Sequence, residues 1–386
     1  MSAVPKPLRE AGHRQRMRRL RERMGEAGVD LVIAYAWGNH SYLDFNPVWY
    51  LSGLKQIGPH AALLVPQTGE SRLLLTPSFD LERATERVDD IEVIVTDALA
   101  GAEFVELVRR HLPELHAEAT VALVSGDDPP LSDAGAWTSV FGRPVTDSSK
   151  LLAEIAKTRD DLALALIARA TEIAEDAYRH MLAIARPGLG EHLLLAELDA
   201  RMRSLGADDA FLLMSSSQHN HCVHWATERT LEAGDIVLAE ISPSVDGEFV
   251  QICRSFVLGR EPSEDERDAF ALLDVCFHEG MLAARPGAQV DAVVQAINGP
   301  LIDAGYEQYI VPPYMRTRGH ANGMGPPIPE LRPGDQSELL ERMTFELHPN
   351  QYIPEVGYLM CGEPVIVERD AARPLTSKVG TLDWVG

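Results

Sequence analysis

Residues 235–259, DIVLAEISPSVDGEFVQICRSFVLG, decide how the C-terminal part of this chain folds. Two runs rich in Ile, Val, Leu and Phe flank the dipeptide Asp246-Gly247. Such a dipeptide favours the left-handed backbone angles of a tight two-residue turn, so the stretch predicts an antiparallel β-hairpin. Glu240 and Gln251 are polar side chains within the otherwise apolar arms of this hairpin.

Amphipathic helices and further strands surround the hairpin in the sequence. From residue 162 to residue 184, apolar side chains recur at spacings of three and four, and the pattern stops at Pro187. The same periodicities predict helices over 190–205, 263–284 and 289–304, and strands near 343–350 and 364–368.

The first part of the chain has a different texture. The short apolar runs DLVIAYA, HAALLVP, RLLLTP and IEVIVTD accompany amphipathic helical patterns over 12–27 and 102–112. This mixture predicts an α/β domain. Because 386 residues are enough for two domains, we expect an α/β domain over 1–155 and a second, mixed α+β domain over 156–386.

Composition argues against several classes of protein. The chain has 35 basic and 58 acidic side chains, hence a formal charge of −23, which counts against nucleic acid and anionic membranes as partners. It contains neither a run of about 18 apolar residues nor a signal-peptide pattern, so we expect a cytoplasmic protein. Its four cysteines form no CxxC pair, so neither a disulfide framework nor a zinc knuckle is expected.

Several motifs in a fixed order resemble the pita-bread family, which includes creatinase, prolidase, Xaa-Pro aminopeptidase and methionine aminopeptidase. LEAGDIVLAEIS and RSFVLG resemble the ligand strands of that family, RGHANGMG its glycine-rich histidine turn, and ERMTFELHPNQY its glutamate strand. NHSYLDFNPVWYLSGL resembles the N-terminal domain of the creatinase and prolidase branch. The resemblance covers nearly the whole chain and implies a creatinase-like α/β domain, followed by a pita-bread domain in which helices cover a curved antiparallel sheet.

The resemblance also implies where metal ligands would stand. In the metallopeptidases of the family, two Asp, one His and two Glu hold two divalent ions. The matching positions here are Glu240, Gln251, His320, His348 and either Gly362 or Glu363. Two divalent ions need several anionic oxygens, and at most two carboxylates remain. We therefore expect no metal cofactor or, as an alternative, a single divalent ion held by Glu240, His320 and His348.

The resemblance to creatinase implies a metal-free reaction, because that enzyme uses a histidine as acid and base and carboxylates as substrate anchors. His224 matches the position of the family's histidine, and imidazole exchanges protons near neutral pH. We therefore expect His224 to act as the general acid and base, His320 and His348 as proton-sharing partners, and Glu240 and Glu363 as anchors for the substrate.

Further side chains are candidates for substrate contact, namely Gln251, Glu346, His219, His221, Arg316 and Arg318. Glu346 and His348 alternate along one strand and point to the same face, so Glu346 lies either in the site or at its rim. Arg316 and Arg318 flank the glycine-rich turn and either clamp a substrate carboxylate or are structural. Pro327 stands where peptidases of the family carry a second histidine, which counts against ordinary peptide hydrolysis.

The sequence thus predicts a creatinase-like hydrolase that cleaves a non-peptide C–N bond of a small molecule, such as an amidine, ureido group, lactam or small amide. Two alternatives stay open: a metal-dependent hydrolase or lyase with a mononuclear site, and a non-catalytic binding module related to Xaa-Pro peptidases. By analogy with creatinase-like dimers, we expect a homodimer in which Lys55 or His60 reaches the partner's site.

Overall fold

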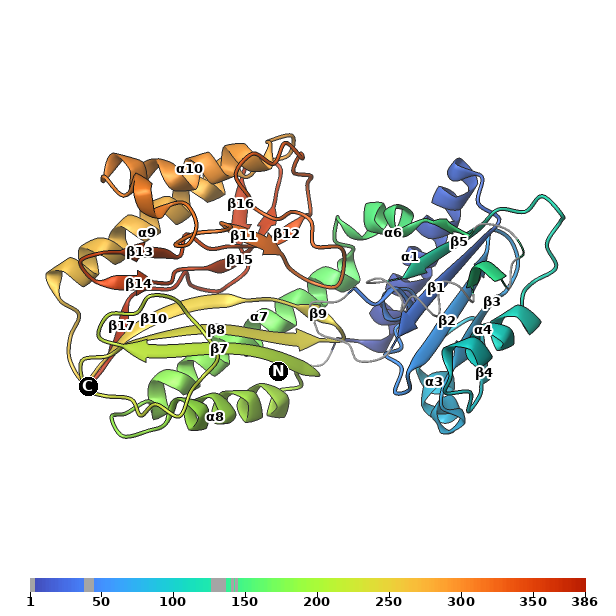
Figure 1. Ribbon diagram of the computed structural model, residues 1–386, viewed down its shortest axis with the longest axis horizontal. Helices are drawn as coiled ribbons and strands as arrows, with labels where there is room; N and C mark the ends of the chain where they lie inside the picture. Colours follow the sequence, from blue (N-terminus) through green and yellow to red (C-terminus); the bar gives the residue numbers. More distant parts are fainter. Residues whose placement is uncertain (1–3, 38–44, 126–136, 140–141, 143–144) are drawn as a thin grey trace. The chain divides into compact units, whose positions relative to one another are not determined.

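The computed structural model describes residues 4–37, 45–125, 137–139, 142 and 145–386, and these form two compact units. The N-terminal unit comprises residues 4–157 with 324–326, and the C-terminal unit comprises 158–323 and 327–386. Figure 1 shows a sheet with flanking helices in each unit.

A mixed six-stranded sheet in the order β4-β3-β2-β1-β5-β6 organises the N-terminal unit. Its strands are β1 (Leu31–Trp37), β2 (His60–Pro66), β3 (Ser71–Leu75), β4 (Ile91–Val95), β5 (Val121–Ser125) and β6 (Thr146–Asp147). The elements that pack on one face are α1 (Lys6–Ala27), α2 (Pro47–Ser52), α3 (Leu81–Arg87) and α6 (Ser149–Ala156). The other face carries α4 (Gly101–Arg110), and η1 (Ser78–Asp80) precedes α3. This is the α/β domain that the alternating pattern predicts.

Strand β1 shows why a continuous apolar run forms a central strand. Leu31, Ile33 and Tyr35 enter the core on one face, whereas Val32 and Ala34 enter the core on the other. Side chains of a strand alternate between faces, so a strand that is covered on both sides needs apolar residues at every position.

Two sheets and their covering helices build the C-terminal unit. The first sheet has the order β17-β10-β8-β7, and β9 pairs with β8. These strands are β7 (Asp209–Ser217), β8 (Ile236–Val245), β9 (Glu248–Phe249), β10 (Ile252–Leu258) and β17 (Asp383–Val385). The second sheet consists, in order, of β11 (Gly319–Ala321), β12 (Thr344–Leu347), β15 (Glu363–Val367) and β16 (Ala372–Pro374). A separate hairpin is formed by β13 (Gln351–Ile353) and β14 (Gly357–Leu359).

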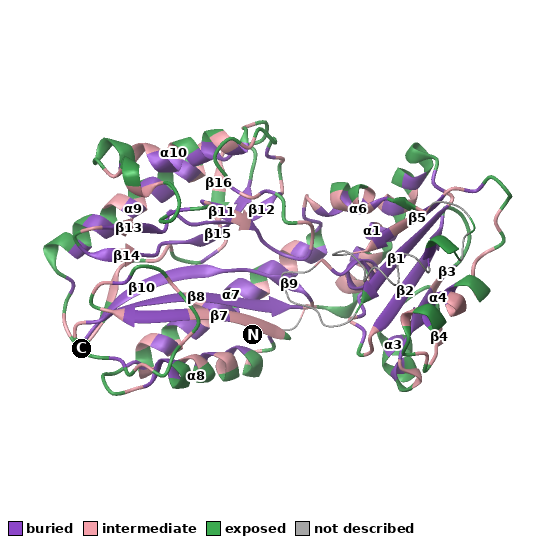
Figure 2. Cartoon of the chain, in the orientation of Figure 1, coloured by how far each residue is buried: buried purple, intermediate pink, exposed green. Residues whose placement is uncertain are grey.

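The helices of the C-terminal unit cover the outer faces of these sheets (Figure 1). The first sheet is covered by α7 (Asp161–Ile184) and α8 (Glu191–Ser204), and α9 (Glu264–Ala283) and α10 (Val290–Asp303) lie over the second. The short turn η2 (Glu307–Tyr309) follows α10. Strands β8, β10 and β12 are consequently almost entirely buried (Figure 2).

The predicted hairpin forms around its predicted turn. Asp246 and Gly247 have φ values of 48° and 81°, the left-handed angles of a two-residue turn. Across the hairpin, Cys253 pairs with Glu240, and Gln251 lies two residues before Cys253, between β9 and β10. Since strand side chains alternate, Glu240, Gln251 and Cys253 share one face.

The two sheets of the C-terminal unit meet at a β-bridge between Cys253 and Gly362. The amide nitrogen of Cys253 donates to the carbonyl of Gly362 at 3.0 Å, and the reverse bond measures 3.3 Å. This bridge brings the polar face of the hairpin next to the strands that carry His320 and Glu346.

Candidate active site

Glu240, Gln251 and His320 form a hydrogen-bonded chain. Gln251 Nε2 lies 3.3 Å from Glu240 Oε2, and Gln251 Oε1 lies 3.2 Å from His320 Nε2. The imidazole of His348 is adjacent, with its centroid 5.5 Å from that of His320. Four sequence-predicted residues therefore come together where the two sheets meet.

The Gln251 amide links the protonation of Glu240 to the tautomer of His320. An ionised Glu240 accepts from the amide nitrogen of Gln251, whose oxygen then requires a proton on His320 Nε2. His320 Nδ1 also faces the carbonyl of Ala321 at 3.2 Å, and a carbonyl can only accept. When a neutral His320 carries its proton on Nδ1, the amide turns over and its oxygen faces a protonated Glu240.

Burial favours the uncharged form of each titratable group in this site. It raises the pKa of Glu240 to about 7. The pKa of Glu346 is raised well above its usual value by burial, and further by the nearby carboxylates of Glu363 and Glu240. Burial lowers the pKa of His320, and burial together with the neighbouring His320 lowers the pKa of His348 to about 3. At neutral pH the site therefore holds neutral imidazoles and a Glu240 close to its midpoint.

Glu346 and Asn322 carry buried polar atoms that lack hydrogen-bond partners. Both side chains are 0 % exposed, and neither the two carboxyl oxygens nor the two amide atoms make a hydrogen bond of normal geometry within the described part of the chain. The Asn322 amide is close enough to lower the pKa of Glu346 slightly. Nδ1 of His348 is unpartnered in the same way. Since Glu346 pairs with His320 across β12 and β11, these groups lie on the same face as the hydrogen-bonded chain.

Gly362 faces the site, whereas Glu363 is used elsewhere. A Cβ atom on Gly362 would lie 2.8 Å from Cβ of His348 and 2.9 Å from Cβ and Sγ of Cys253, so no larger side chain fits there. Glu363 forms a buried ion pair with Arg254 at 3.0 Å and accepts from the amide of Gly380 at 2.6 Å. The structure thus places Glu363 in a structural ion pair and leaves a glycine at the position next to His348.

These residues do not fit the paired-metal centre that the family implies. Of the positions matched to ligands, Glu240 supplies a carboxylate, Gln251 supplies a neutral amide, and Gly362 supplies nothing. Two divalent ions would lack the anionic oxygens that they require. Within the residues that the structure describes, no three His, Cys, Asp or Glu side chains are arranged to hold a metal ion.

The predicted histidines of the loop before β8 make other contacts than with the hydrogen-bonded chain, as far as the described residues show. His224 is exposed, and its Nδ1 lies 2.8 Å from the carbonyl of Trp225. The structure shows no hydrogen bond or ring contact from His224 to Glu240 or His320 in the residues that it describes. The rings of His219 and His221 each lie 5.7 Å from the ring of Tyr352, and His221 is exposed.

Arg318 is a buried residue that holds the segment next to His348 in place. It is fully buried and donates to Asn298, to the carbonyl of Asn350 and to Gln351, at distances of 2.7, 3.0 and 2.9 Å. Burial lowers its pKa to about 10. Its carbonyl also accepts from the amide of His348 at 3.0 Å, so Arg318 holds the turn that carries this imidazole. Arg316 is exposed.

His60 was expected to reach a partner's site, but its side chain does not project from the N-terminal unit. Its side chain is buried, with Nδ1 2.9 Å from the hydroxyl of Tyr35 and Nε2 3.0 Å from the carbonyl of Leu99. The prediction that His60 reaches a partner's site is therefore wrong, because its ring nitrogens serve the core of its own unit. Lys55 lies over the ring of Trp49, 4.9 Å from the centroid.

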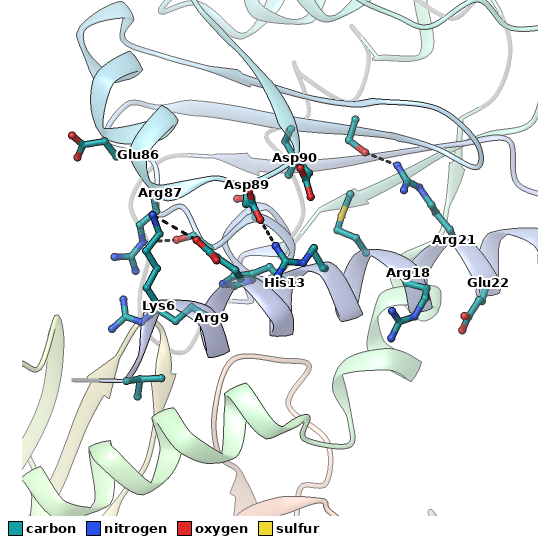
Figure 3. Close-up of a pocket in the computed structure, with 18 residues that line it drawn as sticks. Lys6, Arg9, His13, Arg18, Arg21, Glu22, Glu86, Arg87, Asp89 and Asp90 are labelled. Atoms are coloured by element: carbon teal, nitrogen blue, oxygen red, sulfur yellow. Dashed lines mark hydrogen bonds and ion pairs between the residues drawn. The ribbon is translucent and has the colours of Figure 1, made fainter. Parts of the chain in front are cut away.

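A cavity of about 870 Å³ lies along α1 in the N-terminal unit (Figure 3). None of the predicted site residues lines it. Its wall mixes cationic and anionic side chains that already have partners: Arg14 pairs with Asp89, and Arg21 donates to the carbonyl of Gly69 and to Ser71. The lining therefore carries side chains of both charges.

Sequence reasoning missed Asn322 and Cys253 as members of the site. Sγ of Cys253 lies 3.8 Å from Gln251 Oε1, and burial raises the pKa of this thiol, so it stays protonated. Asn322 follows His320 by two residues, and Cys253 follows Gln251 by two. The alternation of side chains along a strand was the signal that would have found both.

Comparisons with known proteins agree with the fold. Residues 165–369 match the model of metallopeptidase family M24, and residues 16–155 match the creatinase/prolidase N-terminal domain. These matches confirm the predicted order of a creatinase-like α/β domain and a pita-bread domain. No described helix has the length and apolar character needed to cross a lipid bilayer.

Relatives and solved structures are similar at low identity. The chain is 25% identical over 237 residues to the uncharacterized peptidase YqhT of Bacillus subtilis, and 26% identical over 231 residues to an Xaa-Pro dipeptidase of Pyrococcus furiosus. These matches cover 60% and 58% of this chain and only 65% and 63% of the two relatives. The structure of an X-Pro aminopeptidase from Thermotoga maritima superposes with a TM-score of 0.81 at 20% identity, over 96% of this chain and 99% of that one.

Proposed function

Because this chain belongs to metallopeptidase family M24, we propose that it is a hydrolase that cleaves a C–N bond of a small molecule without a pair of metal ions. The hydrogen-bonded chain of Glu240, Gln251 and His320 carries this proposal. It occupies, with neutral or singly charged groups, the positions at which two ions would need carboxylates. Localisation in the cytoplasm and a homodimeric state stay predictions.

The arrangement supports hydrolysis by proton transfer. Glu240, with a pKa of about 7, suits the role of a base that removes a proton from water as the water oxygen bonds to the substrate carbon. The C–N bond then breaks, and its electron pair, together with the proton that Glu240 took from water, goes to the leaving nitrogen. Loss of this proton returns Glu240 to its ionised form, and the neutral His320 holds the Gln251 amide that orients the Glu240 carboxylate. One water is consumed, and no net proton is gained by the protein.

A non-peptide substrate agrees best with the residues around this chain. Pro327 replaces the second histidine of family peptidases, and Gly362 leaves no carboxylate next to His348. This combination favours a creatinase-like activity on an amidine, ureido group, lactam or small amide.

Xaa-Pro dipeptide hydrolysis is the second candidate, because relatives such as the Pyrococcus furiosus protein carry that name. It predicts a requirement for divalent ions that the first candidate does not share.

The test is to assay purified full-length protein against small amidines, ureides, lactams and Xaa-Pro dipeptides, after exhaustive chelation and again with Mn²⁺ or Zn²⁺. We expect turnover of a non-peptide C–N compound, at a rate that chelation changes by no more than about twofold. Activity confined to Xaa-Pro dipeptides and restored by metal would establish the second candidate instead. Elemental analysis of the same samples reports how much metal each one holds.

A further inference from the structure

Glu346 has no counterpart among the five positions matched to metal ligands, yet it lies on the same face as His320. Its carboxyl group is fully buried, and both of its oxygens lack hydrogen-bond partners among the described residues. Burying a polar group without a partner costs free energy, because the group loses its hydrogen bonds to water. An unpartnered buried group calls for an explanation, and a ligand that supplies the missing partners is one.

Asn322 defines what that ligand must offer. Its amide oxygen and nitrogen are also buried without partners, and it lies close enough to influence the carboxyl of Glu346. When Glu346 is ionised, the two side chains present three acceptor oxygens and one amide nitrogen that donates. A complementary group carries several N–H donors on a small planar frame, because two parallel N–H groups match the two oxygens of a carboxylate.

The charges around Glu346 indicate the sign of the ligand. Glu240 is a second carboxyl near it, the imidazoles of His320 and His348 are neutral, and the positive charge of Arg254 is already paired with Glu363. Burial keeps Glu346 uncharged in the free protein, and a bound cation supplies the charge that stabilises its ionised form, which a neutral amide cannot do.

We propose that Glu346 and Asn322 form a subsite for a planar cationic group, an amidinium or guanidinium carried by the substrate. This inference rests on the proposed function only in placing the group beside Glu240 and His320, where a C–N bond of the bound group faces the base. It names the class of substrate: a C–N compound that is positively charged at neutral pH.

Binding of small probe ions to the chelated full-length protein tests the subsite without any turnover. Acetamidinium and acetamide have nearly the same shape and differ in charge and in donor number. By calorimetry at matched ionic strength, acetamidinium is expected to bind the wild-type protein at least about tenfold more tightly, as expected for two hydrogen bonds to a charged group.

Matched variants assign this preference to its residues. Glu346→Gln keeps the shape of the side chain and is expected to reduce the ratio of the two dissociation constants to within about twofold. Glu341→Gln, the same change at an exposed position five residues earlier, is expected to retain it. Asn322→Ser leaves Glu346 in place and is expected to lower the ratio several-fold, which keeps the proposal testable even where Glu346→Gln folds poorly.

Three results would overturn the subsite: equal affinity for acetamidinium and acetamide, a preference that survives in Glu346→Gln, or displacement of acetamidinium by micromolar Mn²⁺ or Zn²⁺. If the protein prefers acetamidinium but hydrolyses only dipeptides, and only with added metal, the subsite stands and the proposed function is wrong. If the chelated protein hydrolyses neutral amides but does not bind acetamidinium, the proposed function stands and the subsite is wrong.

Discussion

Gln251 shows how one residue changes the chemistry that a site can perform. Both ends of its amide are engaged, one by Glu240 and the other by His320. A carboxylate at this position would bind a cation, whereas the amide relays a hydrogen bond between an acid and an imidazole. We therefore expect the charge at position 251 to select between metal binding and proton transfer.

Replacing Gln251 by Glu is expected to move the site toward metal binding. The variant places a second carboxylate beside Glu240, so the protein should gain stoichiometric Mn²⁺ or Zn²⁺ and lose at least about tenfold in metal-free turnover. Elemental analysis and assays after chelation measure both effects. Gln336→Glu, at an exposed position, is the control that should change neither. Unaltered metal-free turnover in Gln251→Glu would contradict the relay.

His348 makes the stability of the protein depend on pH. Its pKa of about 3 in the folded protein lies below the ordinary value of 6.5, so below about pH 6.5 the unfolded chain binds a proton that the folded protein excludes. The free energy of unfolding should therefore fall as the pH falls from about 6.5 toward 3, by up to about 1.4 kcal/mol per pH unit from this group.

His348→Asn is expected to remove that part of the pH dependence. Urea unfolding at pH 4, 5 and 6 should give a shallower slope than the wild-type protein, by about 1 kcal/mol per pH unit. The exposed His278 provides the comparison, since His278→Asn makes the same substitution outside the buried site. Identical slopes in all three proteins would show that His348 is not excluded from protonation.

At the scale of elements, a buried ion pair ties strand β10 to strand β15. Arg254 and Glu363 are 4% and 0% exposed in their side chains, and the Arg254 guanidinium also lies over the ring of Tyr178, 5.6 Å from the centroid. Glu363 additionally accepts from Gly380, just before β17. The pair therefore joins β10, which directly follows Gln251, to β15. The neighbour of β15 in the sheet is β12, which directly precedes His348.

Glu363→Gln is expected to destabilise the C-terminal unit by about 3–5 kcal/mol, because it leaves the charge of Arg254 buried and unpaired. The preference of the folded protein for acetamidinium over acetamide should persist, because the Glu363 carboxylate is already engaged by Arg254 and Gly380. Chemical unfolding and calorimetry on the same samples separate the two effects. Loss of the preference at unchanged stability would instead make Glu363 a substrate anchor.

At the scale of the whole molecule, the fold followed from patterns that repeat along the chain. Apolar periodicity located the helices of the C-terminal unit to within one or two residues, as for the pattern over 162–184 and the helix Asp161–Ile184. The Asp246-Gly247 turn located the hairpin. These signals are local, because backbone geometry alone fixes periods of 3.6 and 2 residues.

The candidate site was harder to predict because its members come from separate strands. Glu346 was identified only as either a site or a rim residue, and Asn322 was not identified at all. His224, which matches the family histidine, is exposed in the structure, whereas Glu363 proved to be paired with Arg254. Sequence position gives the face of a strand, but it does not give the partner that another strand brings to that face.

The sequence by itself determined the family, the two-domain α/β and pita-bread architecture, and the shortage of carboxylates at the ligand positions. Only the tertiary structure decided that Gly362 has no room for a side chain, that Gln251 joins Glu240 to His320, and that Glu346 and Asn322 are buried without partners. The reason is physical: periodicity and residue type are local properties, whereas burial and hydrogen bonding depend on which distant strands meet.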